Sequence, residues 1–291
     1  MRVAITGVTG RLGTALAGEL EERHEVVRLD RRALDLSKPH GLAAALDGLD
    51  FDVLVNPAAV TSPDAAEDNP GLARLVNAEA PGVLAEICRK RGARMLQVST
   101  DYVFGGEKEG FLVEDDPAEP INVYGATKLA GEQAVLGAYP EALVVRVCWL
   151  YGGDRPGFPD QIVKKALAGE RLELIGDKFS IPTWVPQLAE WFARLLEAPE
   201  TSGVVQVCPS GPPASWRDWG LAALEAAVET GVLERVPDVA RLHLDECAFL
   251  RVPRPRHTVM SNARFAKILG TPVPSWRDGV SRAIRNAWPP R

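Results

Sequence analysis

A glycine-rich turn between an apolar run and an amphipathic helix is the feature that most constrains this chain. The sequence TGVTGRLG places Gly7, Gly10 and Gly13 at a regular spacing, after the apolar run 2–6 and before a helical pattern at 11–22. Glycines here allow a tight turn, a close approach of the backbone to a phosphate, and close packing of helix on strand. The arrangement predicts a dinucleotide-binding turn, with free N–H groups of the helix N-terminus at the phosphates.

Apolar runs and helical patterns alternate through the first half of the chain. Further strands are expected at 25–29, 52–55, 94–98 and 142–147, and helices at 70–91 and after residue 123. Alternating strands and helices imply right-handed crossovers and a parallel sheet covered on both faces. The predicted fold class is therefore α/β, a Rossmann-like doubly wound parallel sheet.

The alternation becomes less regular after residue 151. Helices are expected at 161–168, 185–197, 215–230, 261–269 and 276–287, and a strand at 203–207 is expected to rejoin the main sheet. Proline-rich connectors separate these segments. We predict an NAD(P)-binding domain over residues 1–150, with later segments near 180–207 returning to it. Residues 151–291 would form mainly a smaller C-terminal α/β lobe that binds the substrate.

Composition excludes several classes of protein. The 291 residues carry 33 lysines and arginines against 39 aspartates and glutamates, a net charge of −6, which argues against nucleic acid or an anionic membrane as a partner. No run of about 18 apolar residues is present, and Met1 leads directly into an apolar strand without a signal-peptide pattern. The four cysteines lie far apart, which argues against a zinc site or a disulfide framework. These features predict a cytoplasmic protein.

The end of the second expected strand bears on the choice of cofactor. Asp30 follows Gly13 by 17 residues, where a carboxylate would bind a ribose and repel a 2′-phosphate, which favours NAD(H). Arg31 and Arg32 come next and could accommodate that phosphate, so NADP(H) stays open. Four further residues are assigned to the cofactor: Asp35 and Leu36 beside the adenine, and Ala58 and Ala59 beside the nicotinamide riboside.

A phenol and an ammonium lie four residues apart in the expected helix after residue 123. Tyr124 and Lys128 would share one helix face, and Thr100 lies where the fourth strand ends. A nearby Lys⁺ would lower the pKa of the tyrosine, which could then protonate a carbonyl oxygen while Thr100 donates to the same oxygen. Tyr-x-x-x-Lys alone is common in helices that do no chemistry. Together with the glycine turn and the strand end, it predicts carbonyl reduction.

Longer runs carry a resemblance to a known family. They are STDYVFG at 99–105, NVYGATKLAGE at 122–132, RVCWLY at 146–151 and IPT at 181–183, with Arg254-Pro255 and Ser275-Trp276 near the end. The chain resembles the extended short-chain dehydrogenase/reductases, and most of all the dTDP-4-dehydrorhamnose reductase family. The resemblance implies reduction of the C4 ketone of a deoxy-sugar nucleotide, as in dTDP-L-rhamnose biosynthesis.

The resemblance also implies site residues. The catalytic set would be Tyr124, Lys128 and Thr100. Around the cofactor it implies Gly10, Arg11, Leu12, Asp30, Asp35, Leu36, Ala59, Val60 and Thr61, and beside the sugar Asp101 and Trp149. Arg254 could grip the substrate diphosphate in bidentate fashion, although a Pro-Arg-Pro-Arg loop is as often only a solvated one.

Several positions depart from the family pattern. Val60, Ala65, Lys178 and Ser180 differ from the residues that are usual there, so the sugar and its nucleotide stay open. Ala15 stands where some members carry a glutamate linked to a magnesium-dependent dimer, which argues against Mg²⁺; no residue is assigned to a metal, and a homodimer stays open. Two other functions stay open: an NAD-dependent sugar-nucleotide epimerase, and a non-catalytic nucleotide-binding regulatory subunit of the same fold.

Overall fold

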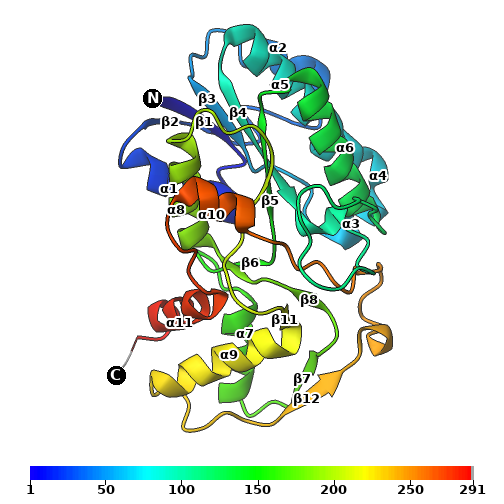
Figure 1. Ribbon diagram of the computed structural model, residues 1–291, viewed down its shortest axis with the longest axis vertical. Helices are drawn as coiled ribbons and strands as arrows, with labels where there is room; N and C mark the ends of the chain where they lie inside the picture. Colours follow the sequence, from blue (N-terminus) through cyan, green and yellow to red (C-terminus); the bar gives the residue numbers. More distant parts are fainter. Residues whose placement is uncertain (290–291) are drawn as a thin grey trace.

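A parallel sheet of six strands is the framework of the molecule. The computed structural model describes residues 1–289, with the sheet and its helices in the upper part of Figure 1. The strand order is β10-β5-β4-β3-β1-β2, and every neighbouring pair is parallel. The strands are β1 (Arg2–Thr6), β2 (Glu25–Leu29), β3 (Val53–Asn56), β4 (Arg94–Thr100), β5 (Leu143–Val147) and β10 (Gly203–Gln206). The predicted Rossmann-like α/β fold is confirmed.

Helices cover both faces of this sheet. On one face lie α1 (Arg11–Glu21), α8 (Val185–Leu196) and α10 (Ala263–Leu269); on the other lie α2 (Leu42–Ala45), α5 (Ala80–Arg91) and α6 (Val123–Ala138). Because both faces are covered, the central strands have continuous apolar sequences rather than alternating ones, and every residue of β3 and β5 is buried. The carboxyl ends of β1, β4 and β5 meet at one edge, where ligands bind in such folds.

The segment expected as one helix over 70–91 is divided. It consists of α4 (Pro70–Arg74), a π-helical turn η2 (Leu75–Glu79) and α5, and a separate helix, α3 (Pro63–Asp68), precedes it. Pro81 explains the break, because it has no N–H to donate to the carbonyl four residues earlier, which is that of Asn77. The N–H of Ala80 instead reaches back to Leu75, five residues away, as a π turn requires.

A smaller lobe lies below the sheet in Figure 1. Its helices are α7 (Phe158–Leu167), α9 (Trp216–Glu229) and α11 (Trp276–Ala287), all close to the expected ranges. Three two-stranded sheets were not expected: β6 (Leu150–Tyr151) with β9 (Thr183–Trp184), β7 (Leu172–Ile175) with β12 (Val239–Leu242), and β8 (Phe179–Ser180) with β11 (Ala214–Ser215). Strands of two to four residues are too short for a periodic pattern. Short 3-10 turns complete the chain: η1 (Pro39–Gly41), η3 (Asp101–Val103) and η4 (Leu244–Glu246).

Candidate active site

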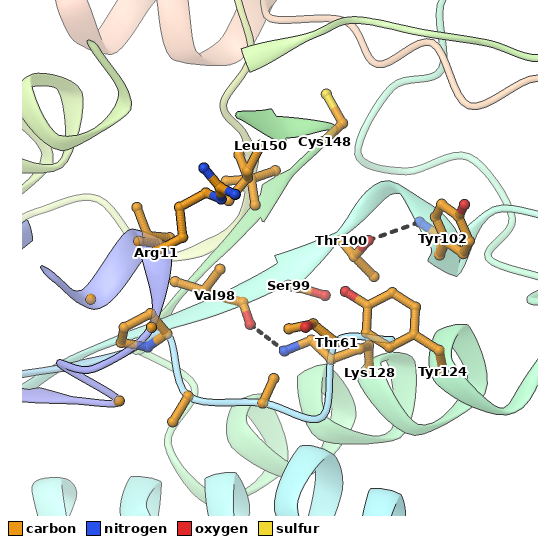
Figure 2. Close-up of a pocket in the computed structure, with 18 of the residues that line it drawn as sticks. Arg11, Thr61, Val98, Ser99, Thr100, Tyr102, Tyr124, Lys128, Cys148 and Leu150 are labelled. Atoms are coloured by element: carbon orange, nitrogen blue, oxygen red, sulfur yellow. Dashed lines mark hydrogen bonds between the residues drawn. The ribbon is translucent and has the colours of Figure 1, made fainter. Parts of the chain in front are cut away.

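A cavity among the described residues opens at the carboxyl edge of the sheet. It has a volume of about 650 Å³ and is lined by the glycine turn after β1, the ends of β4 and β5, and the first turns of α6. Ala58, Ala59 and Thr61, from the loop after β3, form one wall. The cavity therefore brings the expected cofactor turn and the expected catalytic residues to one place (Figure 2).

The glycine turn has the geometry that a dinucleotide needs. Gly7 has φ +56°, a backbone conformation that residues other than glycine rarely adopt. A Cβ on Gly13 would lie 2.2 Å from the Gly7 carbonyl oxygen, so α1 can begin this close to the turn only with glycine there. Gly10 borders the cavity, where its bare backbone leaves room for a phosphate. These observations fit a pyrophosphate at the N-terminus of α1.

A second hollow continues from the first toward β2. It has a volume of about 180 Å³, shares Gly7, Ala58 and Ala59 with the first cavity, and is also lined by Leu36 and Val60. Arg31 and Asp35 stand at its rim, 3.6 Å apart. An adenosine fits a narrow hollow with apolar walls and charged groups at the rim, so the residues present fit a dinucleotide.

Asp30 and Arg11 are both engaged within the protein. Asp30 Oδ1 accepts from the backbone N–H groups of Arg32 and Ala33, each at 2.9 Å, so one carboxylate oxygen holds the turn after β2. Arg11 donates to the carbonyls of Gly152 and Arg155 at 2.6 and 2.7 Å. Arg11 therefore ties the loop after β6 to the glycine turn, and both Arg11 and its neighbour Leu12 line the cavity.

Tyr124 and Lys128 lie one helical turn apart at the start of α6. Asn122 begins this helix, since its side chain accepts from the Gly125 N–H at 2.8 Å. Lys128 is buried, and its Nζ donates to the Val98 carbonyl on β4 at 2.6 Å. The Tyr124 ring extends from α6 toward the end of β4, where Thr100 lies (Figure 2). The three residues predicted as a catalytic set thus border one cavity.

The expected lowering of the Tyr124 pKa is wrong for this structure. Burial raises the pKa of Tyr124 to about 12, against a smaller lowering by the Thr100 hydroxyl. Burial also lowers the pKa of Lys128 to about 8, against a smaller opposite effect of Glu132. For both groups the effect of burial on the pKa is larger than that of the partners, because burial penalises the charged form. Tyr124 therefore keeps its proton at neutral pH, as a proton donor must.

Asp101 lies at the rear of the cavity, and its carboxylate accepts hydrogen bonds from three hydroxyl groups of the protein. Its Oδ2 accepts from the hydroxyls of Thr258 at 2.6 Å and Ser180 at 3.0 Å, and its Oδ1 accepts from Thr100 at 3.2 Å. Burial raises the pKa of Asp101, and the charge of Lys178 is the largest opposing influence. Asp101 thus borders the cavity, but all its hydrogen bonds run into the protein.

Trp149 and Arg254, the other residues assigned to the substrate, are placed differently. Trp149 lines the cavity and stacks on Trp219 with ring centroids 5.5 Å apart. Among the described residues it is the one non-glycine residue with positive φ, at 44°. Arg254 is not among the residues that line the cavity; it pairs with Asp64 of α3 at 2.7 Å and donates to the Val252 carbonyl.

Asn77, in the π turn, is a site residue that sequence reasoning missed. Its side chain accepts from the Val60 N–H at 2.8 Å and donates to the Val60 carbonyl at 3.0 Å. It also donates to Thr127 of α6 at 3.1 Å. Asn77 thus fastens the loop after β3 to the helix of Tyr124. Pro81 was the one signal in the sequence, because a proline inside a helical pattern indicates a break.

Two negative findings apply to residues 1–289. No group of three or more histidine, cysteine, aspartate or glutamate side chains could hold a metal ion there. In the same part of the chain, no helix is both long and apolar enough to cross a membrane.

A Tyr-x-x-x-Lys pair beside the glycine turn of a Rossmann-like sheet defines the class of extended short-chain dehydrogenases/reductases. A family model described as RmlD substrate binding domain matches residues 1–288. The chain belongs to the dTDP-4-dehydrorhamnose reductase family, as the sequence predicted.

Curated relatives match over nearly the whole chain. The dTDP-4-dehydrorhamnose reductase of Burkholderia thailandensis is 34% identical, over 98% of this chain and 99% of its own length. A probable dTDP-4,6-dihydroxy-2-methyloxan-3-one 4-ketoreductase of Streptomyces antibioticus is 35% identical, over 99% of this chain and 95% of its own length. The family is therefore one of oxidoreductases acting on dTDP-linked sugars.

Solved structures agree with the fold over its full length. A dTDP-4-dehydrorhamnose reductase of Clostridium acetobutylicum has a TM-score of 0.89 at 27% identity and covers 99% of both chains. The enzyme of Bacillus anthracis, solved in complex with NADP, has a TM-score of 0.88 at 27% identity and covers 98% of this chain and 99% of its own.

Proposed function

We propose that this protein reduces the C4 ketone of a dTDP-linked deoxy sugar, in the type case dTDP-4-dehydrorhamnose, with NADH or NADPH. The observation that carries the proposal is the meeting of Tyr124, Lys128 and Thr100 in the cavity that the glycine turn also borders. The names of the relatives support the substrate class, since they are reductases of dTDP-4-dehydro sugars.

The cofactor would lie along the two continuous hollows. Gly7, Gly10, Leu12 and Gly13 would hold its pyrophosphate, and the rim of the second hollow would hold the adenosine. When bound, the nicotinamide supplies hydride to the ketone carbon. The remaining cofactor assignments are Arg11, Asp30, Asp35, Leu36, Ala58, Ala59, Val60, Thr61, Tyr124 and Lys128.

Tyr124 is the proton donor in this proposal. Its buried hydroxyl is protonated at neutral pH and faces the cavity beside Thr100, so it can protonate the ketone oxygen as charge develops there. Lys128 holds a positive charge behind the phenol, fixed by the Val98 carbonyl, and stabilises the phenolate that proton transfer leaves.

The substrate side is proposed from Trp149, Asp101 and Arg254. The indole of Trp149 offers a flat apolar face to a sugar ring, and Asp101 fixes the polar rear wall. Arg254 would have to exchange Asp64 for the substrate diphosphate. The name of the Streptomyces relative favours a second candidate substrate, a differently substituted dTDP-4-keto sugar.

Changing Tyr124→Phe tests the function directly. Purified protein should oxidise NADH or NADPH with dTDP-4-dehydrorhamnose, and the variant should lose about 10²–10⁴-fold in kcat because the proton donor is gone. Cofactor binding, measured by fluorescence titration, should persist. Tyr139→Phe removes a phenol from the far end of α6 and serves as the matched control. Undiminished turnover in Tyr124→Phe would contradict the mechanism.

The same purified protein distinguishes the reductase from the two other candidate functions. An epimerase would retain its cofactor through purification and turn over sugar nucleotides without net oxidation of NADH. A regulatory subunit would show no reductase activity on any keto sugar and would copurify with a stoichiometric partner enzyme.

We keep three wider expectations as proposals. They are a cofactor domain over 1–150 to which later segments near 180–207 return, with 151–291 mainly a substrate lobe, a homodimer, and a cytoplasmic location. Light scattering with and without Mg²⁺ tests the dimer and its metal dependence.

A further inference from the structure

The hydrogen-bond ladder between β3 and β4 ends beside the cavity, at Asn56 opposite Gln97. The first bond of this ladder sets its phase, and the bonds of a parallel pair recur every two residues along each strand. The next bond would therefore join the Ala58 N–H to the Val98 carbonyl. Ala58 instead belongs to the loop that forms one wall of the cavity, and its N–H donates to the Thr6 hydroxyl at 3.4 Å.

Three buried side chains connect the two backbone groups that the ladder leaves apart. The Thr6 hydroxyl donates to Asn56 Oδ1. Asn56 Nδ2 donates to Gln97 Oε1 at 2.7 Å, and Gln97 Nε2 donates to the Val98 carbonyl at 2.8 Å. Each of the three side chains belongs to a residue that is at most 2% exposed. This amide chain, Thr6, Asn56 and Gln97, thus runs from the Ala58 N–H to the Val98 carbonyl.

The carbonyl at the end of the amide chain determines the direction of each bond. A carbonyl oxygen only accepts, so the Gln97 amide must present its NH₂ group to Val98 and its oxygen to Asn56. Asn56 must then present its oxygen to Thr6, whose single hydroxyl hydrogen is used there. The Thr6 oxygen is left to accept from Ala58. Reversing either amide would place like groups against each other, so the chain has one arrangement.

The Val98 carbonyl also holds Lys128. The Lys128 Nζ donates to it at 2.6 Å (Figure 2). A carbonyl oxygen has two lone pairs, and the Gln97 N–H occupies one of them. The ammonium is thereby restricted to the other lone pair, which fixes where its charge lies relative to Tyr124. Gln97 is not among the residues that line the cavity, so it acts on the site from behind.

We propose that Gln97 is a positioning residue for the reduction: its amide occupies one side of the Val98 carbonyl and so holds the Lys128 ammonium in a single place. Thr6 and Asn56 orient the amide for this role. The proposal deepens the function proposed for the same site and rests on it. Gln97 acts through Lys128 and not through the substrate.

A second buried lysine offers a comparison within the same molecule. Lys178 has 0% of its surface exposed, and its Nζ donates to the Pro255 carbonyl at 2.7 Å. Its ammonium also faces the rings of Tyr102 and Trp149, 5.0 and 5.5 Å from their centroids. Aromatic faces attract an ammonium, so Lys178 is held without the amide chain.

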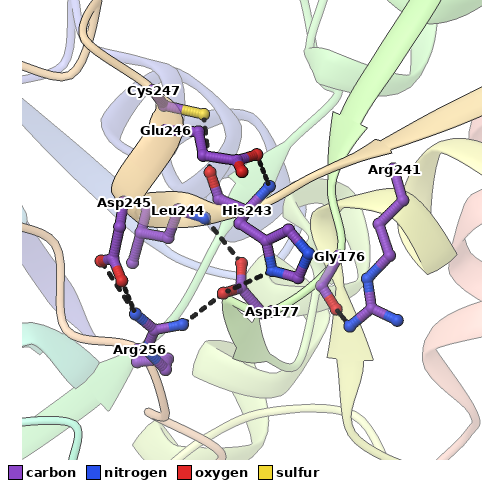
Figure 3. Close-up of polar contacts among 9 residues, drawn as sticks. All are labelled: Gly176, Asp177, Arg241, His243, Leu244, Asp245, Glu246, Cys247 and Arg256. Atoms are coloured by element: carbon purple, nitrogen blue, oxygen red, sulfur yellow. Dashed lines mark hydrogen bonds and ion pairs between the residues drawn. The ribbon is translucent and has the colours of Figure 1, made fainter.

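Contacts of the preceding residue help to place Lys178. Asp177 accepts from the Leu244 N–H at 2.8 Å and forms an ion pair with Arg256 (Figure 3). These contacts are separate from the amide chain. A change in that chain should therefore alter Lys128 and leave Lys178 as it is.

NMR of the two lysines tests the proposal without substrate. Full-length protein carries ¹³C-labelled lysine, and the signals are assigned by their loss in Lys128→Met and Lys178→Gln. A lysine held in one place has two distinct Hε shifts, whereas a mobile lysine averages them. Gln97→Met removes the amide at a similar side-chain size, so the Hε signals of Lys128 should merge while those of Lys178 stay distinct. Merged Lys128 signals in the wild type, or distinct ones in Gln97→Met, would overturn the proposal.

The reaction rate tests the consequence for catalysis. Gln97→Met should lower kcat by about 10- to 100-fold, because a small displacement of a catalytic group is costly. The KM for the keto sugar should change little, since Gln97 does not line the cavity. A loss of kcat in which the Lys128 signals stay distinct would show that Gln97 acts by another route, and would overturn the proposal.

Gln206→Met is the matched control. Gln206 lies in β10 of the same sheet and is also fully buried, but within residues 1–289 neither atom of its side-chain amide has a hydrogen-bond partner. The substitution should leave kcat and the signals of Lys128 unchanged. Equal effects of Gln97→Met and Gln206→Met would show only the cost of a methionine in the sheet, and would contradict a specific role of Gln97.

A second variant covers the case in which Gln97→Met does not fold. The single substitution leaves the buried Asn56 amide without its acceptor, which is destabilising. Asn56→Leu/Gln97→Met removes that amide as well, so it should fold and should merge the Lys128 signals in the same way. Distinct Lys128 signals in the double variant would overturn the proposal. Absence of reductase activity in the wild type would instead contradict the proposed function, while the NMR signals still report whether Gln97 positions Lys128.

Discussion

The two lysines of the site, Lys128 and Lys178, show how burial alone changes a residue's chemistry. Both have a pKa lowered to about 8 by burial, from 10.5 in water, although each lies near a carboxylate. At neutral pH both remain charged, and both lose the charge within the range of ordinary assays. A sequence pattern identifies Lys128 by its spacing from Tyr124. It does not reveal Lys178, whose burial depends on an inward turn held by residues more than 60 positions away.

Titration of Lys128 should be visible in the reaction rate. Because the protonated form stabilises the phenolate of Tyr124, kcat should be constant below about pH 8 and fall above it, as Lys128 loses its proton. Steady-state rates between pH 6 and 9.5 measure this directly. Lys178→Gln should retain the alkaline limb because Lys128 is intact, while Lys128→Met should show no measurable limb because activity is lost. A wild-type profile that is flat to pH 9.5 would exclude this role.

At the scale of elements, the catalytic helix depends on its contact with the π turn. The Asn77 carbonyl, which receives no N–H from Pro81, lies against Gly131 of α6, where a Cβ would stand 2.0 Å from the oxygen. This approach allows Asn77 to bridge Val60 and Thr127. A helix pattern places Tyr124 and Lys128 on one face correctly, because that depends only on local periodicity. The pattern does not predict how α6 packs on the preceding segment. Periodicity over 70–91 indicates one continuous helix, whereas the π turn that contacts α6 interrupts it.

Two glycines of α6 offer a matched test of that contact. Gly131→Ala should destabilise the protein by about 1–3 kcal/mol, since the added methyl forces α6 away from the π turn. Gly137→Ala, in the same helix with open space around it, should stabilise by about 1 kcal/mol through helix propensity. Urea unfolding measures both changes. Equal effects of the two substitutions would exclude a close approach at Gly131.

At the scale of the whole molecule, the sheet is completed by residues far along the chain. The strand β10 pairs with β5, and α8 packs with α1 on the same face of the sheet. The sequence predicted this return, because the run 203–207 has the apolar character of a buried strand. The contacts that hold the lobe in place were not predictable, since Arg251 and Arg254, which join Asp64 and Asp68 of α3, lie in an irregular segment without any periodic signal.

A fragment of residues 1–150 should therefore not fold as an independent domain. It would leave the edge of β5 unpaired and expose the apolar face that α8 and α10 cover, so aggregation is expected. A fragment of residues 1–210, which adds β10 and α8, should be more soluble and unfold more cooperatively. Size-exclusion chromatography and urea unfolding of both fragments provide the measurement. A monomeric 1–150 fragment with a sharp transition would contradict this view of the sheet.

The left-handed backbone at Trp149 has a consequence for how this protein can change by mutation. The conformation costs a tryptophan about 1–3 kcal/mol, and glycine adopts it freely. The tryptophan codon UGG becomes the glycine codon GGG by one base change. Trp149→Gly would relieve the backbone and, in the same mutational step, remove the aromatic wall beside the proposed sugar site. A single mutation at this position would thus widen the proposed site and also relieve the strain of the main chain.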